Sequence, residues 1–375
     1  MPLVKRPHQA KFFVKGGQRA RRMLLAVGIF SLLVGVVAGV GEFALLPWIQ
    51  ARRLADCVYP ALTAFGGSLA EVNTLVRELF TLVSGEEPPS PQWSFNLPQG
   101  LEEQRERVAG ERAKSGFYDF LSQAEKDIAL ISDSFAGQDD FGGRAMVAGA
   151  KVGQLESGAT ADLRLLMEKA RACEAAADVS RDKFDLFATA LPSHLPTPLA
   201  SVEDDLVTLA EEGESYLTEA QRAARYYQVI TDVQIGLVPA TVSLVDLVQD
   251  LYLASNPVIY LGALDTLAAT VDNLAQQVEG LSGFLPTGMA WLHEDNREVF
   301  SLYRWLLGEA KLAVSSLDFA HFDKAVTQFE RELETLATRA KTYELSFWQE
   351  TPLLKGYGRL LVRFGRTKAR LEEFR

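Results

Sequence analysis

The chain of 375 residues carries a formal net charge of −11, and its hydrophobic content of 48% is ample for a core. The charge is uneven: residues 1–53 hold nine basic residues and one acidic, residues 353–375 hold seven and two, and the middle holds 22 basic and 46 acidic. An acidic body binds polyanions poorly, so we expect no nucleic-acid partner.

The first predicted element is a membrane-spanning helix. Residues 23–41 include no charged side chain. The apolar character extends to Trp48, and this length is enough to cross a hydrocarbon core of about 30 Å. Arg19, Arg21 and Arg22 precede the run directly. We expect an uncleaved signal anchor over residues 23–48, with a cleaved signal peptide or a buried core helix as the alternatives.

The distribution of basic residues predicts the orientation of this anchor. Seven basic residues and no acidic residue precede the apolar run, whereas only Arg52 and Arg53 follow it closely. The positive-inside rule then places the N-terminus in the cytoplasm and the body outside it, in a single-pass membrane protein. An alternative stays open, in which the body is cytoplasmic and the basic C-terminal tail lies on the inner membrane surface.

Small residues share one face of the predicted anchor with a carboxylate. This stripe comprises Gly28, Ser31, Gly35, Ala38, Gly39 and Glu42. Gly35 and Gly39 form a G-x-x-x-G pair, which lets two helix backbones approach closely in lipid. We expect this face to contact another membrane helix, from a second copy or a different protein. The alternative is that glycine is simply common in membrane helices and that Glu42 marks the end of the span.

Beyond the anchor, the sequence predicts an all-α protein whose body is an elongated helical bundle or coiled coil. Apolar residues recur at alternating spacings of three and four along residues 206–230, 264–285 and 319–347. The last series is the most regular and comprises Phe319, Phe322, Val326, Phe329, Leu333, Leu336, Ala340, Tyr343 and Phe347. Aromatic side chains at so many core positions favour a bundle over a two-stranded zipper.

Proline and glycine clusters divide the chain. We expect a basic cytoplasmic arm (1–22), the anchor (23–48), a membrane-proximal helix (49–84), a Pro-rich linker (85–100), an acidic helical bundle (101–351) and a basic amphipathic tail (352–375). Within the bundle we expect Ser201 to open a helix and Pro239 to interrupt one. Residues 229–264 are read as a buried core helix, because no charge-free run there is long enough to cross a membrane.

The tail alternates apolar and basic side chains. Its cations are Lys355, Arg359, Arg363, Arg366, Lys368 and Arg370. Such a helix suits anionic lipid, an acidic partner or the acidic body of the chain itself, and a solvated terminal helix is the simplest alternative.

Few residues suggest chemistry. The sequence has no phosphate-binding loop, nucleophile motif or metal-binding motif, and Asp318 with His321 lacks the second pair that a bundle metal site needs. Cys57 and Cys173 are too few for a disulfide framework and are expected to be free, with a Cys57–Cys173 disulfide or a Cys57 link between two copies as the alternatives. We therefore expect no metal, no cofactor and no enzymatic activity.

These features favour a membrane-anchored structural, scaffold or assembly subunit. We expect it to contact membrane lipid and to bind other membrane or extracytoplasmic proteins, or further copies of itself, through helical surfaces. The alternative function is an extracytoplasmic ligand-sensing bundle that signals through a membrane partner.

Overall fold

The computed structural model describes residues 46–84, 113–136 and 141–375. These residues form eight α-helices and three short 3₁₀ segments, without a strand among them, so the predicted all-α body is confirmed. The basic arm, the anchor up to residue 45 and the Pro-rich linker lie outside the described residues.

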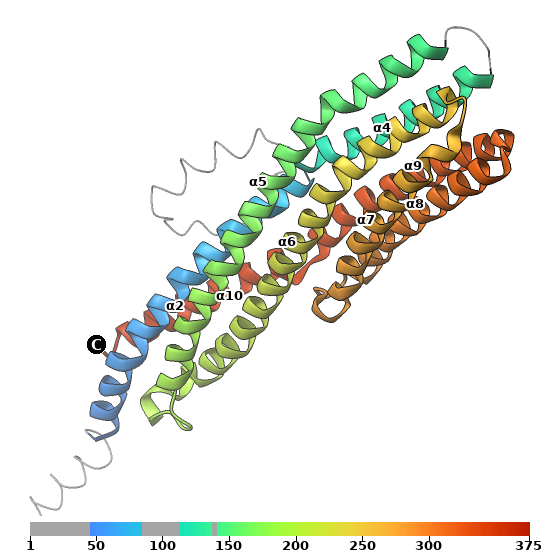
Figure 1. The fold of residues 1–375 in the computed structure, drawn as a ribbon. Coiled ribbons are helices and arrows are strands. Elements are labelled where there is room, and N and C mark those ends of the chain that lie inside the picture. The colour runs from blue at the N-terminus through green and yellow to red at the C-terminus, as the bar shows by residue number, and fades with distance from the viewer. Residues whose placement is uncertain (1–45, 85–112, 137–140) are drawn as a thin grey trace, which may run out of the picture.

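Two long antiparallel helices form the axis of the molecule. α5 (Phe141–Ala190) has 50 residues and α6 (Glu203–Leu253) has 51, and a turn that contains the 3₁₀ segment Thr197–Val202 joins them. At about 1.5 Å per residue, each helix is about 75 Å long. The molecule is therefore a rod, and the other helices lie along this central pair (Figure 1).

One half of the rod holds both ends of the described chain, and we call it the terminal bundle. Here α2 (Leu46–Ser84) and α10 (Pro352–Glu372) pack against the end of α5 and the start of α6. The buried Phe65 ring lies 5.4 to 5.8 Å from the rings of Phe184, Phe187 and Phe364. Gly213 makes this fit possible, because a Cβ atom there would lie 2.9 Å from the Phe65 ring.

The other half is the distal bundle. It contains α4 (Ala113–Ala136), α7 (Leu261–Glu279), α8 (Ala290–Ser316) and α9 (Phe319–Glu350), packed against the start of α5 and the end of α6. α9 then leads into α10, so these two helices follow one another along the rod (Figure 1).

Two local predictions differ from the structure. Pro239 does not end a helix, because α6 continues through it; the proline side chain faces solvent, while its neighbours Val238 and Ala240 are buried and hold the segment in place. Ser201 does not cap α6 either. It lies inside the preceding 3₁₀ segment, and the N-cap residue, Val202, makes no side-chain hydrogen bond.

Two helices of the described chain are long and apolar enough to cross a membrane by length and composition alone. They cover Thr197–Leu253 and Pro257–Phe284, and 56% and 28% of their most apolar windows are buried inside the protein. Residues 229–253 of α6 are thus largely internal, as expected. The single helix expected over residues 229–264 is wrong in its last part, because α6 ends at Leu253. The 3₁₀ segment Pro257–Tyr260, with exposed Val258 and Ile259, follows it. Of the predicted anchor, residues 23–48, only residues 46–48 are described, and they form the start of α2.

Candidate functional site

The predicted contact face of the anchor lies outside the described residues. It comprises Gly28, Ser31, Gly35, Gly39 and Glu42, so the packing of this face stays a prediction.

The structure places the predicted α9 series partly in the core. Phe322, Val326, Phe329, Leu333 and Leu336 are buried, and Phe319 and Ala340 are half-buried. Near the end of α9 the core position is taken by a residue outside the predicted series. Tyr343 of the series is 38% exposed, whereas Trp348, which does not belong to it, is fully buried. Trp348 stacks on Tyr227 at 5.8 Å and donates a hydrogen bond to its hydroxyl at 3.0 Å, which turns the inward face of α9. The side chain of Phe347 is not among those that the structure describes.

The basic tail forms α10 and docks on the acidic body of the same chain. Its buried side chains are Leu353, Tyr357, Leu360, Phe364 and Leu371. Arg363 lies 3.5 Å from Glu212 and 4.0 Å from Asp205, and Arg366 lies 3.6 Å from Asp205. Arg370 pairs with Glu373 on the same helix, while Arg359 is exposed and Lys368 lies over the ring of Tyr59. The apolar face of the tail is therefore occupied by the protein itself.

The sequence analysis did not predict a cluster of polar side chains that α6, α8 and α9 form in the distal bundle. It consists of Gln234 on α6, Asp295, Asn296 and Glu298 on α8, and Arg339 on α9, and we call it the polar cluster. The Arg339 guanidinium contacts Asp295 at 2.5 Å and also pairs with Glu298. Asn296 donates to the Tyr226 hydroxyl at 3.2 Å. The signal that could have revealed the cluster is phase: Gln234 and Asp295 stand at positions where the helical period requires apolar residues.

Burial opposes ionisation in this cluster. Asp295 is only 4% exposed, and this desolvation raises the pKa of its carboxyl although Arg339 acts in the opposite direction. The hydrogen bond to Asp295 in turn raises the pKa of Arg339. The Oδ2 atom of Asp295, the Oε1 atom of Gln234 and the Nε atom of Arg339 have no hydrogen-bond partner among the described residues. The distal bundle thus contains a buried carboxylate paired with a half-buried arginine, and the desolvation of this carboxylate is only partly compensated.

A cavity and a groove flank the polar cluster. The cavity, about 30 Å³ in volume, lies between α4, α6, α8 and α9 beside Gln234 and Asp295, and has room for water but not for an organic ligand. The groove, about 370 Å³, opens on the outside between α8 and α9. Leu336 lines both hollows, Arg339 lines the groove, and Trp305 with Glu298 and Glu332 completes much of the groove wall.

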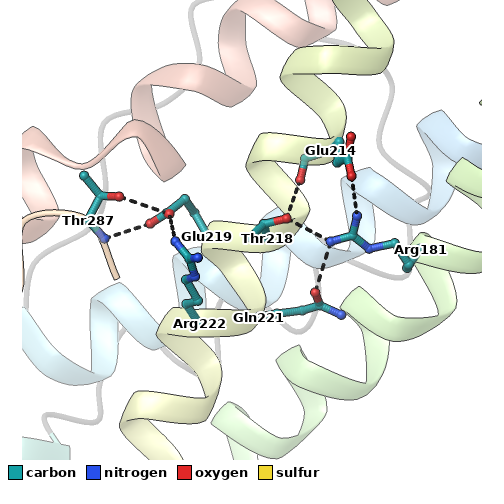
Figure 2. A network of polar contacts seen from close by, with 7 residues as sticks. All are labelled: Arg181, Glu214, Thr218, Glu219, Gln221, Arg222 and Thr287. Carbon is teal, nitrogen blue, oxygen red and sulfur yellow. Dashed lines mark hydrogen bonds and ion pairs between the residues drawn. The ribbon is translucent and has the colours of Figure 1, made fainter. Parts of the chain in front are cut away.

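Hydrogen bonds from α6 fix the segment that precedes the polar cluster (Figure 2). The Glu219 carboxylate accepts hydrogen bonds from the backbone N–H of Thr287 at 2.9 Å and from its hydroxyl at 3.0 Å, and pairs with Arg222 at 3.0 Å. Elsewhere on the same stretch of α6, Thr218 accepts a hydrogen bond at 2.9 Å from Arg181 of α5. These contacts tie α5, and the connection that precedes α8, to α6.

Neither histidine of the distal bundle belongs to a metal site. Within the described part of the chain, no group of three or more histidine, cysteine or carboxylate side chains is placed to hold a metal ion. His321 contacts Glu309 at 2.9 Å on the surface, and burial lowers the pKa of His293. Cys57 is exposed and Cys173 is buried, and both are free thiols.

The chain was also compared with known proteins. No family model, no curated protein and no solved structure matches it.

Proposed function

We propose that this chain is a membrane-anchored, non-enzymatic helical subunit that organises or assembles other proteins. The observation that carries the proposal is an apolar surface at the end of the rod that lies away from the chain termini. We call it the distal apolar surface; it comprises Leu253, Val258, Ile259, Leu312 and Leu317, which are between 49% and 69% exposed.

These side chains lie in or beside two neighbouring connections, with Leu253 at the end of α6 and Leu312 in the last turns of α8. One connection joins α6 to α7 through the 3₁₀ segment Pro257–Tyr260, and the other joins α8 to α9. The 3₁₀ segment contacts α8, and the Tyr252 ring lies 5.7 Å from Phe319. Leu317 has a φ of 57°, a left-handed conformation that residues other than glycine rarely adopt. Exposed apolar side chains gathered in one place are typical of surfaces that bind other proteins.

The opposite end of the rod follows the predicted anchor. α2 begins at Leu46, shortly after the apolar run 23–41. An anchor at this end holds the distal apolar surface up to about 75 Å from the bilayer, since α6 runs the length of the rod. This arrangement supports a subunit that presents a binding surface to a second protein at a distance from the membrane.

The test is purification of the full chain from its native membrane in mild detergent, followed by mass spectrometry. We expect defined partners in a fixed ratio, and loss of these partners in the Ile259→Asp, Leu317→Asp double variant. Val207→Asp is the control, because Val207 is 50% exposed but lies on α6 in the terminal bundle. A lone monomer from native membranes contradicts the proposal, and a homodimer that Gly35→Leu or Gly39→Leu dissociates assigns the contact to the anchor face instead.

The proposed topology has a cytoplasmic N-terminus and an extracytoplasmic body. Cys57 is exposed, whereas Cys173 is fully buried and desolvation raises its pKa to about 12. A membrane-impermeant maleimide added to intact cells should therefore label Cys57 alone, and Cys57→Ser should abolish the label. Labelling only after the membrane is opened would place the body in the cytoplasm.

A second candidate function is ligand sensing, favoured by the groove between α8 and α9. Its volume of about 370 Å³ falls within the range of small-molecule sites, and Trp305 and two carboxylates line it. A ligand-dependent rise in the melting temperature of the full chain that Trp305→Ala removes would support sensing. If no screened ligand raises the melting temperature and defined partners co-purify, the assembly role is the remaining function.

A further inference from the structure

Two neighbouring segments at one end of the terminal bundle are positively charged, although the protein as a whole is acidic and the start of α6 nearby carries Glu203, Asp204 and Asp205. They are the first turns of α2, residues 46–59, and the end of the chain, residues 366–375; Figure 1 shows the C-terminus beside these turns of α2. The two segments carry six basic and three acidic residues, a net charge of +3, whereas the whole chain carries −11. The fold therefore brings together cations that are far apart in the sequence.

Specific contacts hold the two segments together. Arg375 pairs with Asp56 at 3.5 Å, and its guanidinium lies 4.3 Å from the centre of the Tyr59 ring. The Lys368 ammonium lies 5.6 Å from the same ring. Arg53 and Arg370 remain exposed, and the one ion pair of Arg370 is with Glu373, a neighbour on its own helix. These two exposed side chains are accessible to an anion outside the protein.

The same end exposes apolar and aromatic side chains. In the first turn of α2, Leu46 is 52% exposed, Trp48 is 44% exposed and Ile49 is 45% exposed. The Arg52 guanidinium lies 6.0 Å from the centre of the Trp48 ring. Tryptophan beside lysine and arginine is the composition of a membrane–water interface, where the ring lies at the level of the headgroups and the cations reach the phosphates.

We infer that this surface, the start of α2 together with the end of α10, lies on the anionic phospholipid headgroups of the bilayer that holds the anchor. Charge complementarity and the position of Trp48 just after the apolar run 23–41 select lipid over a protein partner. The inference rests on the proposed function, because it requires the anchor. The basic tail then has two roles on two faces: its apolar face docks on α2 and α6, and its last cations meet the lipid.

The experiment places the full chain in nanodiscs and measures amide hydrogen exchange. One nanodisc contains phosphatidylcholine alone, and the other contains one third phosphatidylglycerol. We expect exchange in residues 46–59 and 366–375 to slow by about threefold or more in the anionic nanodisc, and the effect to weaken at high salt. Residues 253–260, at the distal end, should exchange equally in both.

Charge-reversal variants identify the residues responsible. Arg53→Glu with Arg370→Glu should remove the effect of anionic lipid. The matched control is Arg297→Glu with Arg331→Glu, two exposed arginines of the distal bundle that likewise pair only with neighbours on their own helices. Equal exchange in the two nanodiscs, or full protection in the Arg53→Glu, Arg370→Glu variant, overturns the inference. Equal protection by soluble polyphosphate in phosphatidylcholine nanodiscs also overturns it, because the surface would then bind any polyanion.

These results are separable from the fate of the proposed function. Loss of the lipid effect leaves co-purification of partners intact if the chain is an assembly subunit. If alkaline carbonate instead released the full chain from membranes, the chain would have no membrane-spanning anchor, and the proposed function would be wrong.

Discussion

The terminal and distal bundles share α5 and α6 but have different cores. The centre of the terminal bundle is a group of phenylalanine rings around Phe65. The distal bundle buries Gln234, His293 and Asp295 among its apolar residues, and buries Glu125 at 5% exposure where α4 meets α9. One pair of helices thus supports a core centred on phenylalanine rings at one end, where Ser180 and Thr367 are the buried polar side chains nearby, and a core with buried ionisable groups at the other.

Because of this difference, we expect the stability of the two halves to depend differently on pH and salt. Burial of apolar surface is insensitive to pH and salt, whereas buried ionisable groups make stability depend on both. We therefore expect the terminal bundle to hold the two ends of the chain together under all conditions. The distal bundle, which contains the cavity and the groove, should respond to protonation and to bound molecules.

The largest expected effect comes from the terminal core. Phe65→Ala removes a fully buried ring with three aromatic neighbours, so the free energy of unfolding should fall by about 4 kcal/mol. Chemical denaturation of the full chain measures this loss. Phe284→Ala is the control, since Phe284 is 44% exposed under Arg225, and should cost less than about 1 kcal/mol. Equal losses in the two variants would show that the rings around Phe65 do not form the centre of the bundle.

The second effect tests the polar cluster. Arg339→Met leaves the buried Asp295 carboxylate without its cation and should cost about 3 kcal/mol at neutral pH. Adding Asp295→Asn should recover most of this loss, because an amide needs no counter-ion. Arg304→Met is the matched control: Arg304 contacts Asp272 at the same 2.5 Å, but that carboxylate is 52% exposed, so the cost should stay below about 1 kcal/mol. A double variant no more stable than Arg339→Met would rule out an uncompensated charge.

The regular helices of the fold were predictable, because the spacing of apolar residues along the sequence is enough to show which residues face the core. The α6 series from Leu206 through Tyr216 to Ile230 is buried as predicted, since apolar side chains spaced by three and four must share one face of a helix. Pro239 was not predictable in the same way. Its effect on α6 depends on neighbours that other helices hold in place, and those contacts are not visible in a local pattern.

The sequence could mark single members of the polar cluster by their phase but could not bring them together. Gln234, Asp295 and Arg339 lie on three helices and belong to no motif, so only the three-dimensional packing brings them together. The docking of the tail was equally open. Its amphipathic pattern indicates that one face is covered, but several partners satisfy that pattern, and the structure shows that α2 and α6 cover it. Period therefore predicts which residues face inward, but not what they meet there.

The third effect separates the bundles by pH. Burial, together with the carboxylates of Glu330 and Glu334 and against the opposing Lys126, raises the pKa of Glu125 from 4.5 to about 7. The unfolded chain releases this proton at lower pH than the folded chain does. The free energy of unfolding should therefore fall as pH rises from 4.5 to about 7 and stay lower above it.

Glu125→Gln isolates this contribution. The variant should match the parent protein near pH 4 and exceed its stability by about 2 kcal/mol at pH 8, because the amide carries no charge in either state. Thermal unfolding of the two proteins across this range measures the difference. A constant difference between them at all pH values would mean that folding does not shift the pKa of Glu125.

The smallest effect concerns the ion pairs of α10. Arg363 and Arg366 lie 3.5 to 4.0 Å from Asp205 and Glu212 at the surface, so replacing both arginines by glutamine should cost less than about 1 kcal/mol and nothing at high salt. Phe364→Ala, a buried change on the same helix, should cost about 3 kcal/mol at any salt concentration. Denaturation at low and high salt compares the two. A larger, salt-sensitive loss in the arginine variant would mean that charge holds the tail on the body, and the terminal bundle would then resemble the distal one in depending on ionised groups.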